Sequence, residues 1–217
     1  MNDSGSEKFW NSPNAKGYPN ILRLGDQEYQ EPGEGQRALI GEQMKKMGWI
    51  TDGEKLDLGA GPSTGWIYGS EETANNVWAV DFSPKLLSRS GVPEERRIVA
   101  DLRNMKFSDK WRAKFVLATA VLLFRYLTSQ ERRALMRQVK NSLSPNGRLV
   151  IIDIDDMRPE KLSRELGEVE VFDRKATEVV FSELGFTGIE SGIWDLELMQ
   201  GGDYAPFSVD WATGVKP

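Results

Sequence analysis

Cysteine and histidine are both absent from this chain of 217 residues. Without cysteine there is no disulfide framework and no thiolate metal site. Without histidine the chain lacks the commonest general base and the commonest metal ligand. Any proton removal therefore falls to Asp, Glu, Tyr, Lys or water.

Long hydrophobic runs are also missing. The longest, Val116–Phe124, is interrupted by Thr119 and is far shorter than the roughly 20 residues that span a bilayer. It is expected to be a buried central strand that runs into a helix. The first eight residues, Met1–Lys8, lack the apolar core of a signal peptide. We therefore expect a soluble, cytoplasmic protein with no membrane partner.

Positive charge is scarce, and the net charge is −5. The basic doublets Lys45-Lys46, Arg96-Arg97 and Arg132-Arg133 are isolated, which is typical of solvated helix faces. A nucleic-acid-binding protein usually shows a basic face or stripe. A small-molecule partner is therefore expected rather than DNA or RNA. The oligomeric state is left open.

The length favours a single domain, here residues 36–217, preceded by an irregular arm over residues 1–35. The arm is rich in Gly, Pro, Asn and Ser and carries four aromatic residues, Phe9, Trp10, Tyr18 and Tyr29. It is interpreted as a lid over a pocket, as a passively packed arm or as a disordered terminus.

Strands and helices alternate after the arm, which predicts a mostly parallel sheet with helices on both faces. The expected strands are Lys55–Leu58, Val77–Val80, Ile98–Ala100, Phe115–Ala118, Leu149–Asp153, Gly188–Leu198 and Phe207–Val215. The expected helices are Gln36–Met47, Gly65–Ser70, Pro84–Ser90, Ser129–Leu143 and Lys175–Leu184.

The most informative segment is Leu56–Gly65, which reads Leu-Asp-Leu-Gly-Ala-Gly-Pro-Ser-Thr-Gly. Gly59 and Gly61 permit a tight strand-to-helix turn and let a ligand approach the backbone. A purely structural turn would need glycine as well. Asp81 closes the next strand and favours a ligand, because an acid there can accept hydrogen bonds from ribose hydroxyls.

Six ordered motifs resemble those of class I S-adenosylmethionine-dependent methyltransferases, over residues 37–217. They are Asp57–Gly61, Val77–Pro84, Arg97–Leu102, Phe115–Thr119, Leu143–Asp153 and Glu183–Phe186. The resemblance implies an α/β, Rossmann-like class I methyltransferase fold. This is a seven-stranded, mostly parallel sheet with an antiparallel last strand and helices on both faces.

S-adenosylmethionine is the cofactor that the resemblance implies, held at the carboxyl edge of the sheet. Asp57 and the backbone of Gly59, Ala60 and Gly61 would serve its methionine part. Thr119 belongs to the fourth strand, which would run beneath that part.

Asp81 would hold the ribose of the cofactor, and Phe82 would flank the adenine. Asp101 would accept a hydrogen bond from the adenine amino group, and the Leu102 amide would donate to the ring. Each acid also has a structural alternative: Asp81 could cap the helix near Pro84, and Asp101 could cap a turn.

The acceptor side is less well marked. Trp10 and Tyr18 would lie on an arm that folds over the pocket in similar proteins. Arg125 and Tyr126 follow the fourth strand, where relatives carry pocket-lining residues. Arg125 could hold a carboxylate bidentately, or form a surface ion pair. Asp153 ends the fifth strand.

Asp153, Asp155 and Asp156 look like a metal cluster. Metal-dependent relatives also use an acid at the end of the fourth strand, where this chain has Ala118-Thr119. The three aspartates are therefore interpreted as substrate-edge or solvated acids, and no metal is expected. No catalytic residue is assigned, because a methyl sulfonium is already activated and positioning supplies much of the rate.

Two departures from the family pattern leave the substrate open. Ser63 stands where many members have a third glycine, and it could equally cap the next helix. The fourth strand lacks the Asn/Asp-Pro-Pro-aromatic signature, which argues against amino methylation of DNA. The absence of cysteine excludes the covalent carbon methylation of cytosine.

Transfer of a methyl group to an oxygen or nitrogen of a small molecule is the expected function. The alternative is a protein that binds S-adenosylmethionine or S-adenosylhomocysteine without transfer, as a sensor or partner subunit. A nicotinamide dehydrogenase fits less well, because Thr64 breaks the Gly-x-Gly-x-x-Gly pattern. An aminopropyl transferase would need acids at the end of the fourth strand.

Overall fold

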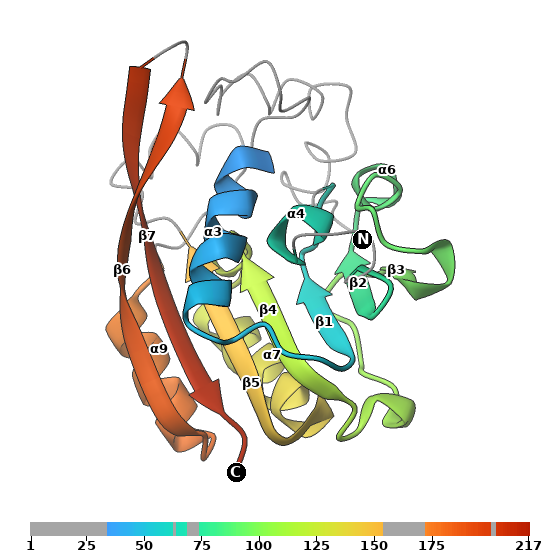
Figure 1. Cartoon of the computed structure of the whole chain (residues 1–217). Helices are drawn as coiled ribbons and strands as arrows, with labels where there is room; N and C mark the ends of the chain where they lie inside the picture. Colours follow the sequence, from blue (N-terminus) through green and yellow to red (C-terminus); the bar gives the residue numbers. More distant parts are fainter. Residues whose placement is uncertain (1–33, 63, 69–73, 154–171, 201–202) are drawn as a thin grey trace.

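A seven-stranded sheet organises the described part of the chain (Figure 1). The computed structural model describes residues 34–62, 64–68, 74–153, 172–200 and 203–217. The strand order is β3-β2-β1-β4-β5-β7-β6, and β7 is antiparallel to both of its neighbours. This confirms the predicted mostly parallel sheet with an antiparallel last strand.

The strands are β1 (Lys55–Leu58), β2 (Val77–Asp81), β3 (Arg97–Val99), β4 (Phe115–Val121), β5 (Leu143–Asp153), β6 (Thr187–Gln200) and β7 (Asp203–Val215). The helices are α3 (Glu34–Lys46), α4 (Thr64–Tyr68), α6 (Pro84–Leu87), α7 (Ser129–Ser142) and α9 (Arg174–Glu183), with 3₁₀ turns η2 (Glu94–Arg96), η3 (Asp109–Trp111) and η4 (Phe124–Tyr126). No helix among the described residues is long and apolar enough to cross a membrane.

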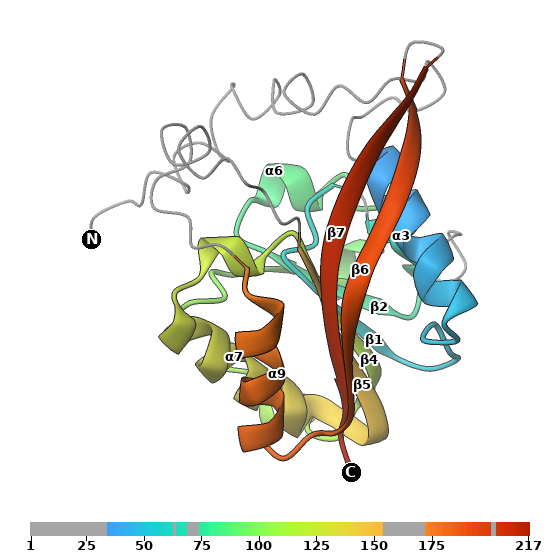
Figure 2. The same cartoon turned by 90° about the vertical axis from the view of Figure 1, so that its left-hand side faces the viewer.

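Alternation along the strands divides the core into two layers. Leu56, Leu58 and Ile151 pack with α7 and α9 on one face of the sheet. Side chains that point to the other face, such as those of Val77 and Ala79, pack with α3, α4 and α6. Figure 2 shows α3 on one side of the sheet and α7 with α9 on the other.

The fourth strand is longer than the sequence predicts. It continues past Ala118 to Val121, because its neighbour β5 runs alongside it and Val121 pairs with Ile152. Thr119 therefore lies within the strand, opposite Asp57 of β1, and is not at the carboxyl edge. The carboxyl end of β4 is Val121 followed by Leu122, so the expectation that Ala118-Thr119 forms that end is wrong.

The observed bounds of three other elements also differ from the predicted ones. β5 begins at Leu143 instead of Leu149, since Phe115 pairs with Leu143 before a shift in register. α6 stops at Leu87, three residues before the predicted end. α3 begins at Glu34, so residue 35, the predicted end of the arm, already lies inside this helix.

Close contact between α3 and α4 depends on a helical glycine. A Cβ atom at Gly41 would lie 2.2 Å from the carbonyl oxygen of Ile67 in α4. No side chain fits at that distance, so Gly41 permits the approach of the two helices. The same face of α3 carries Ile40 and Met44, both fully buried.

Gly41→Ala should lower the free energy of unfolding by about 1–3 kcal/mol, because the added methyl group forces α3 away from α4. Gly65→Ala is the matched control in α4. Its Cβ would lie an ordinary 3.7 Å from the Ser90 carbonyl oxygen, so this variant should be neutral or slightly more stable. Urea unfolding measures both, and equal losses in the two variants would contradict the packing argument.

Candidate functional site at the carboxyl edge of the sheet

The glycine turn after β1 adopts the left-handed backbone that the motif predicts. Gly59 and Gly61 have φ angles of 63° and 58°. A Cβ atom at Gly59 would meet the Leu123 side chain at 2.9 Å. A Cβ atom at Gly61 would make an ordinary contact with Arg37 Nη2 at 3.6 Å, and no other atom of the described residues would lie within 4 Å of it. Among the described residues, the turn is therefore less crowded at Gly61 than at Gly59.

Asp81, at the end of β2, holds this turn in place. Its Oδ2 accepts a hydrogen bond from the Gly61 amide at 2.9 Å, and its Oδ1 accepts one from the Ser83 amide at 2.8 Å. Burial raises the pKa of Asp81, while the two amides oppose that rise. The cap of α6 is Ser83, whose hydroxyl accepts from the Leu86 amide at 3.4 Å. Ser83, and not Asp81, therefore caps this helix.

Asp57 lies in β1 below the turn and is fully buried. Its Oδ1 accepts a hydrogen bond from the Thr119 hydroxyl at 3.0 Å, and that hydroxyl lies 2.7 Å from the Tyr68 hydroxyl. Asp57 Oδ2 and the Thr64 hydroxyl have no hydrogen-bond partner among the described residues. The side chains of Asp57, Thr64, Tyr68 and Thr119 therefore form a buried polar cluster between the sheet and the helices on this face.

Burial makes it unfavourable to ionise the acidic side chains of this cluster, Asp57 and Tyr68. Burial raises the pKa of Asp57; the charge of Arg37 and the proximity of the Thr64 and Thr119 hydroxyls oppose the rise. Burial and the charge of Asp57 raise the pKa of Tyr68 well above its ordinary value. Tyr68 therefore stays protonated at neutral pH.

Arg37 of α3 completes the cluster. Its Nη1 donates to the Ala60 carbonyl at 3.0 Å, and its Nη2 lies 3.4 Å from the carbonyls of both Gly59 and Val121. Sequence reasoning missed this residue. The available signal was a charged residue on the apolar face of a helix, three residues before Ile40 and seven before Met44.

The adenine side of the predicted site contains Asp101, Leu102 and Phe82. Asp101 accepts from the Arg103 amide at 3.0 Å and pairs with the Arg103 guanidinium at 2.8 Å. Burial alone would raise the pKa of Asp101, but its hydrogen bonds with Arg103 lower it. Asp101 thus caps a turn, which is the structural alternative that the sequence offered for this residue. Leu102 is buried in the α7 layer, and Phe82 is half-buried.

Arg125 and Asp153 meet at the ends of β4 and β5. Asp153 Oδ2 accepts from the Arg125 amide at 3.1 Å, and its Oδ1 pairs with the Arg125 guanidinium. Asp153 is fully buried, so it is not a solvated acid, and the ion pair is not at the surface. Tyr126 follows in η4 and is half-buried. Trp10, Tyr18, Ser63, Asp155 and Asp156 lie outside the described residues.

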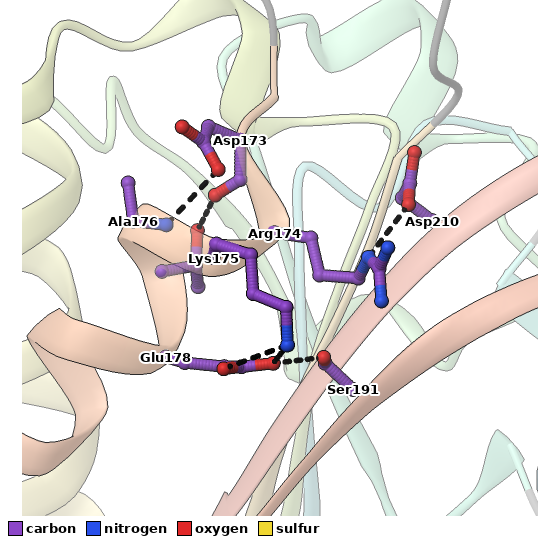
Figure 3. Close-up of polar contacts among 8 residues, drawn as sticks. Asp173, Arg174, Lys175, Ala176, Glu178, Ser191 and Asp210 are labelled. Atoms are coloured by element: carbon purple, nitrogen blue, oxygen red, sulfur yellow. Dashed lines mark hydrogen bonds and ion pairs between the residues drawn. The ribbon is translucent and has the colours of Figure 1, made fainter.

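A second ion pair lies beside the first. Asp210 of β7 is directly opposite Asp153 of β5, and it pairs with Arg174 of α9 at 3.1 Å. Figure 3 shows this contact next to Asp173, which caps α9 by accepting from the Ala176 amide at 3.0 Å. Asp153 and Asp210 thus each pair with an arginine from a different element, Arg125 of η4 and Arg174 of α9. No three acids come together as a metal site within the described ranges.

Residues 56–151 match the family model described as Methyltransferase domain. No curated protein matches the chain. The match spans a little less than half of the chain, and over these residues the chain is similar to methyltransferase domains. These findings support S-adenosylmethionine-dependent methyl transfer.

Solved structures with the same fold are distant in sequence. An S-adenosylmethionine-dependent methyltransferase of Thermotoga maritima is 13% identical, with a TM-score of 0.65 over 98% of this chain and 99% of that one. Magnesium protoporphyrin IX methyltransferase of Synechocystis, with bound S-adenosylhomocysteine, is 12% identical, with a TM-score of 0.62 over 97% of each chain.

Phosphoethanolamine N-methyltransferase 2 of Haemonchus contortus is a larger protein with the same fold. In complex with phosphomonomethylethanolamine and S-adenosylhomocysteine, it is 14% identical to this chain, with a TM-score of 0.69. The match covers 99% of this chain and 61% of that one.

Asp57→Asn tests the electrostatics of the buried cluster. An acid whose folded-state pKa is raised binds its proton more tightly in the folded than in the unfolded chain. Ionisation of Asp57 therefore lowers stability as the pH rises from its ordinary pKa of 3.8 to the folded-state value. The free energy of unfolding of the wild type, measured relative to that of Asp57→Asn, should fall as the pH rises from 3.8 to the folded-state pKa and stay constant at higher pH. Urea unfolding across pH measures it, and a relative stability that rises with pH would contradict the assignment.

Arg125→Met should destabilise the fold by about 3–5 kcal/mol, because it leaves the buried Asp153 carboxylate without its guanidinium partner. Arg133→Met is the matched control, since Arg133 pairs with Glu183 where both side chains are exposed. Arg133→Met should lower the free energy of unfolding by less than about 1 kcal/mol. Chemical denaturation compares the two, and similar small effects would show that the Arg125–Asp153 pair contributes little.

Proposed function

We propose that this protein transfers a methyl group from S-adenosylmethionine to an oxygen or nitrogen of a small-molecule acceptor. The observation that carries the proposal is the glycine turn at Gly61, whose amide donates to Asp81 and where a Cβ atom would meet only Arg37 among the described residues. The methyltransferase domain match and the strand order support it further.

The residues present fit this cofactor. The uncrowded position at Gly61 permits close approach to the backbone, and Arg37 places a positive charge beside it. In the proposal, the backbone of residues 59–61 holds the methionine part and Asp81 holds the ribose. Phe82, Asp101 and Leu102 surround the adenine. Asp57 and Thr119, buried below the turn, support it from beneath.

Bound S-adenosylmethionine supplies an activated methyl sulfonium. The chain's own residues then have to hold the acceptor in line and exclude water, which accounts for much of the acceleration. Arg125, Tyr126 and Asp153 are the proposed acceptor-side residues among those described. Arg125 and Asp153 pair with each other, so in the proposal they shape the acceptor pocket jointly.

A small-molecule acceptor fits the overall acidity of the chain, because a net charge of −5 disfavours nucleic acid. The Haemonchus contortus protein, whose fold is similar, was solved with the small molecule phosphomonomethylethanolamine. We propose an acceptor of comparable size.

Asp81→Ala should weaken S-adenosylmethionine binding at least about tenfold, because hydrogen bonds to an ionised group contribute roughly 1.5–3 kcal/mol each. Calorimetric titration with S-adenosylmethionine and S-adenosylhomocysteine measures the affinity, with reduced nicotinamide nucleotide as competitor. Asp52→Ala, in an exposed turn, is the control and should bind like the wild type.

Three other outcomes have distinct meanings. Unchanged affinity in a folded Asp81→Ala variant would remove Asp81 from the site. Binding of the nicotinamide nucleotide alone would contradict the proposed cofactor. Tight binding of both sulfur ligands without methyl transfer to any of a broad panel of small amines, alcohols and carboxylic acids would favour a sensor or partner subunit.

A further inference from the structure

Arg37 contacts both strand ends between which the proposed methyl transfer would take place. Its guanidinium donates to Gly59 and Ala60 in the turn after β1, and to Val121, the last residue of β4. β1 and β4 are adjacent parallel strands, so these carbonyls belong to neighbouring carboxyl ends. The planar guanidinium presents several donors in a fixed fork, which suits such a bridge.

The position of Arg37 follows from the packing of α3. Arg37 and Gly41 are four residues apart and share one face of the helix. The absence of a side chain at Gly41 lets α3 approach α4 closely, which brings Arg37 down onto the turn. The Arg37 side chain is consequently buried, with a relative exposure of 8% for the residue.

The β4 side of the bridge is fixed by an unusual backbone. Leu122 has a φ of 59°, a left-handed conformation that leucine rarely adopts. Its amide donates to the Ile152 carbonyl at 2.8 Å, which secures the turn to β5. The next residue, Leu123, lies against Gly59, where a Cβ atom would be only 2.9 Å from its side chain. The two strand ends are thus joined at Arg37 and at Leu123.

We propose that Arg37 is a positioning residue that holds the cofactor turn and the end of β4 at a fixed separation. It thereby sets the methionine part of the cofactor relative to the acceptor side of the pocket. This inference rests on the proposed function. It adds a role for a helix that precedes all the motifs of the cofactor site.

Arg37→Lys is the main variant, because lysine keeps the charge but cannot span the three carbonyls as a fork. We expect S-adenosylhomocysteine to bind at least about tenfold more weakly, and adenosine, which lacks the amino-acid part, to lose less than about threefold. A merely structural role would weaken both ligands equally. Arg96→Lys is the matched control, because Arg96 is a partly buried arginine paired with Glu54 before β1. It should bind both ligands like the wild type.

A measurement on the unmodified protein covers the case in which Arg37→Lys does not fold. Hydrogen exchange at the Gly61 and Leu122 amides reports on the two strand ends separately. Saturating S-adenosylhomocysteine should slow exchange at both amides by about tenfold or more, because the bridge couples them. Protection of Gly61 alone would overturn the proposal.

The failure of this inference differs from the failure of the proposed function. If the wild type binds S-adenosylhomocysteine and a folded Arg37→Lys variant binds it equally well, Arg37 is not a positioning residue and the proposed function stands. If the wild type binds neither S-adenosylmethionine nor S-adenosylhomocysteine, the proposed function fails and the positioning role fails with it.

Discussion

The positive charge of Arg37 acts on two buried carboxylates, those of Asp57 and Asp81, and its hydrogen bonds reach three backbone carbonyls. Buried charges are costly unless they are paired or hydrogen-bonded. At this edge of the sheet Asp81 accepts from two amides, whereas Asp57 accepts from Thr119 through Oδ1 and has no partner for Oδ2 among the described residues. The shape of the glycine turn depends on these charged side chains, because the hydrogen bonds of Arg37 and Asp81 also fix the backbone of the turn.

The sheet explains why these groups come together. Parallel strands bring their carboxyl ends to one edge, where the short β1 ends in the glycine turn and the longer β4 passes beside it. Farther along the edge, two more acids, Asp153 and Asp210, lie opposite each other and are paired with Arg125 and Arg174. The glycine turn after β1 therefore rests largely on backbone contacts, and the neighbouring ends of β5 and β7 on side-chain ion pairs.

Local sequence patterns were sufficient to predict much of this arrangement. β1 was predicted with its observed bounds, because a short apolar strand before Gly59 has an unambiguous end. The acid at the tip of β2 also follows from local spacing. The length of β4 does not, because its last three residues are ordered by pairing with β5. The bridge made by Arg37 and the pairing of Arg125 with Asp153 join residues far apart in the chain, which periodicity cannot reveal.

The most direct test of the account is a crystal structure of the protein with S-adenosylhomocysteine. The account predicts ribose hydroxyls within hydrogen-bonding distance of Asp81, the amino-acid part beside Gly61, and the Arg37 guanidinium still bonded to the carbonyls of Gly59, Ala60 and Val121. A ligand bound elsewhere, or bound here with Arg37 withdrawn from those carbonyls, would contradict it.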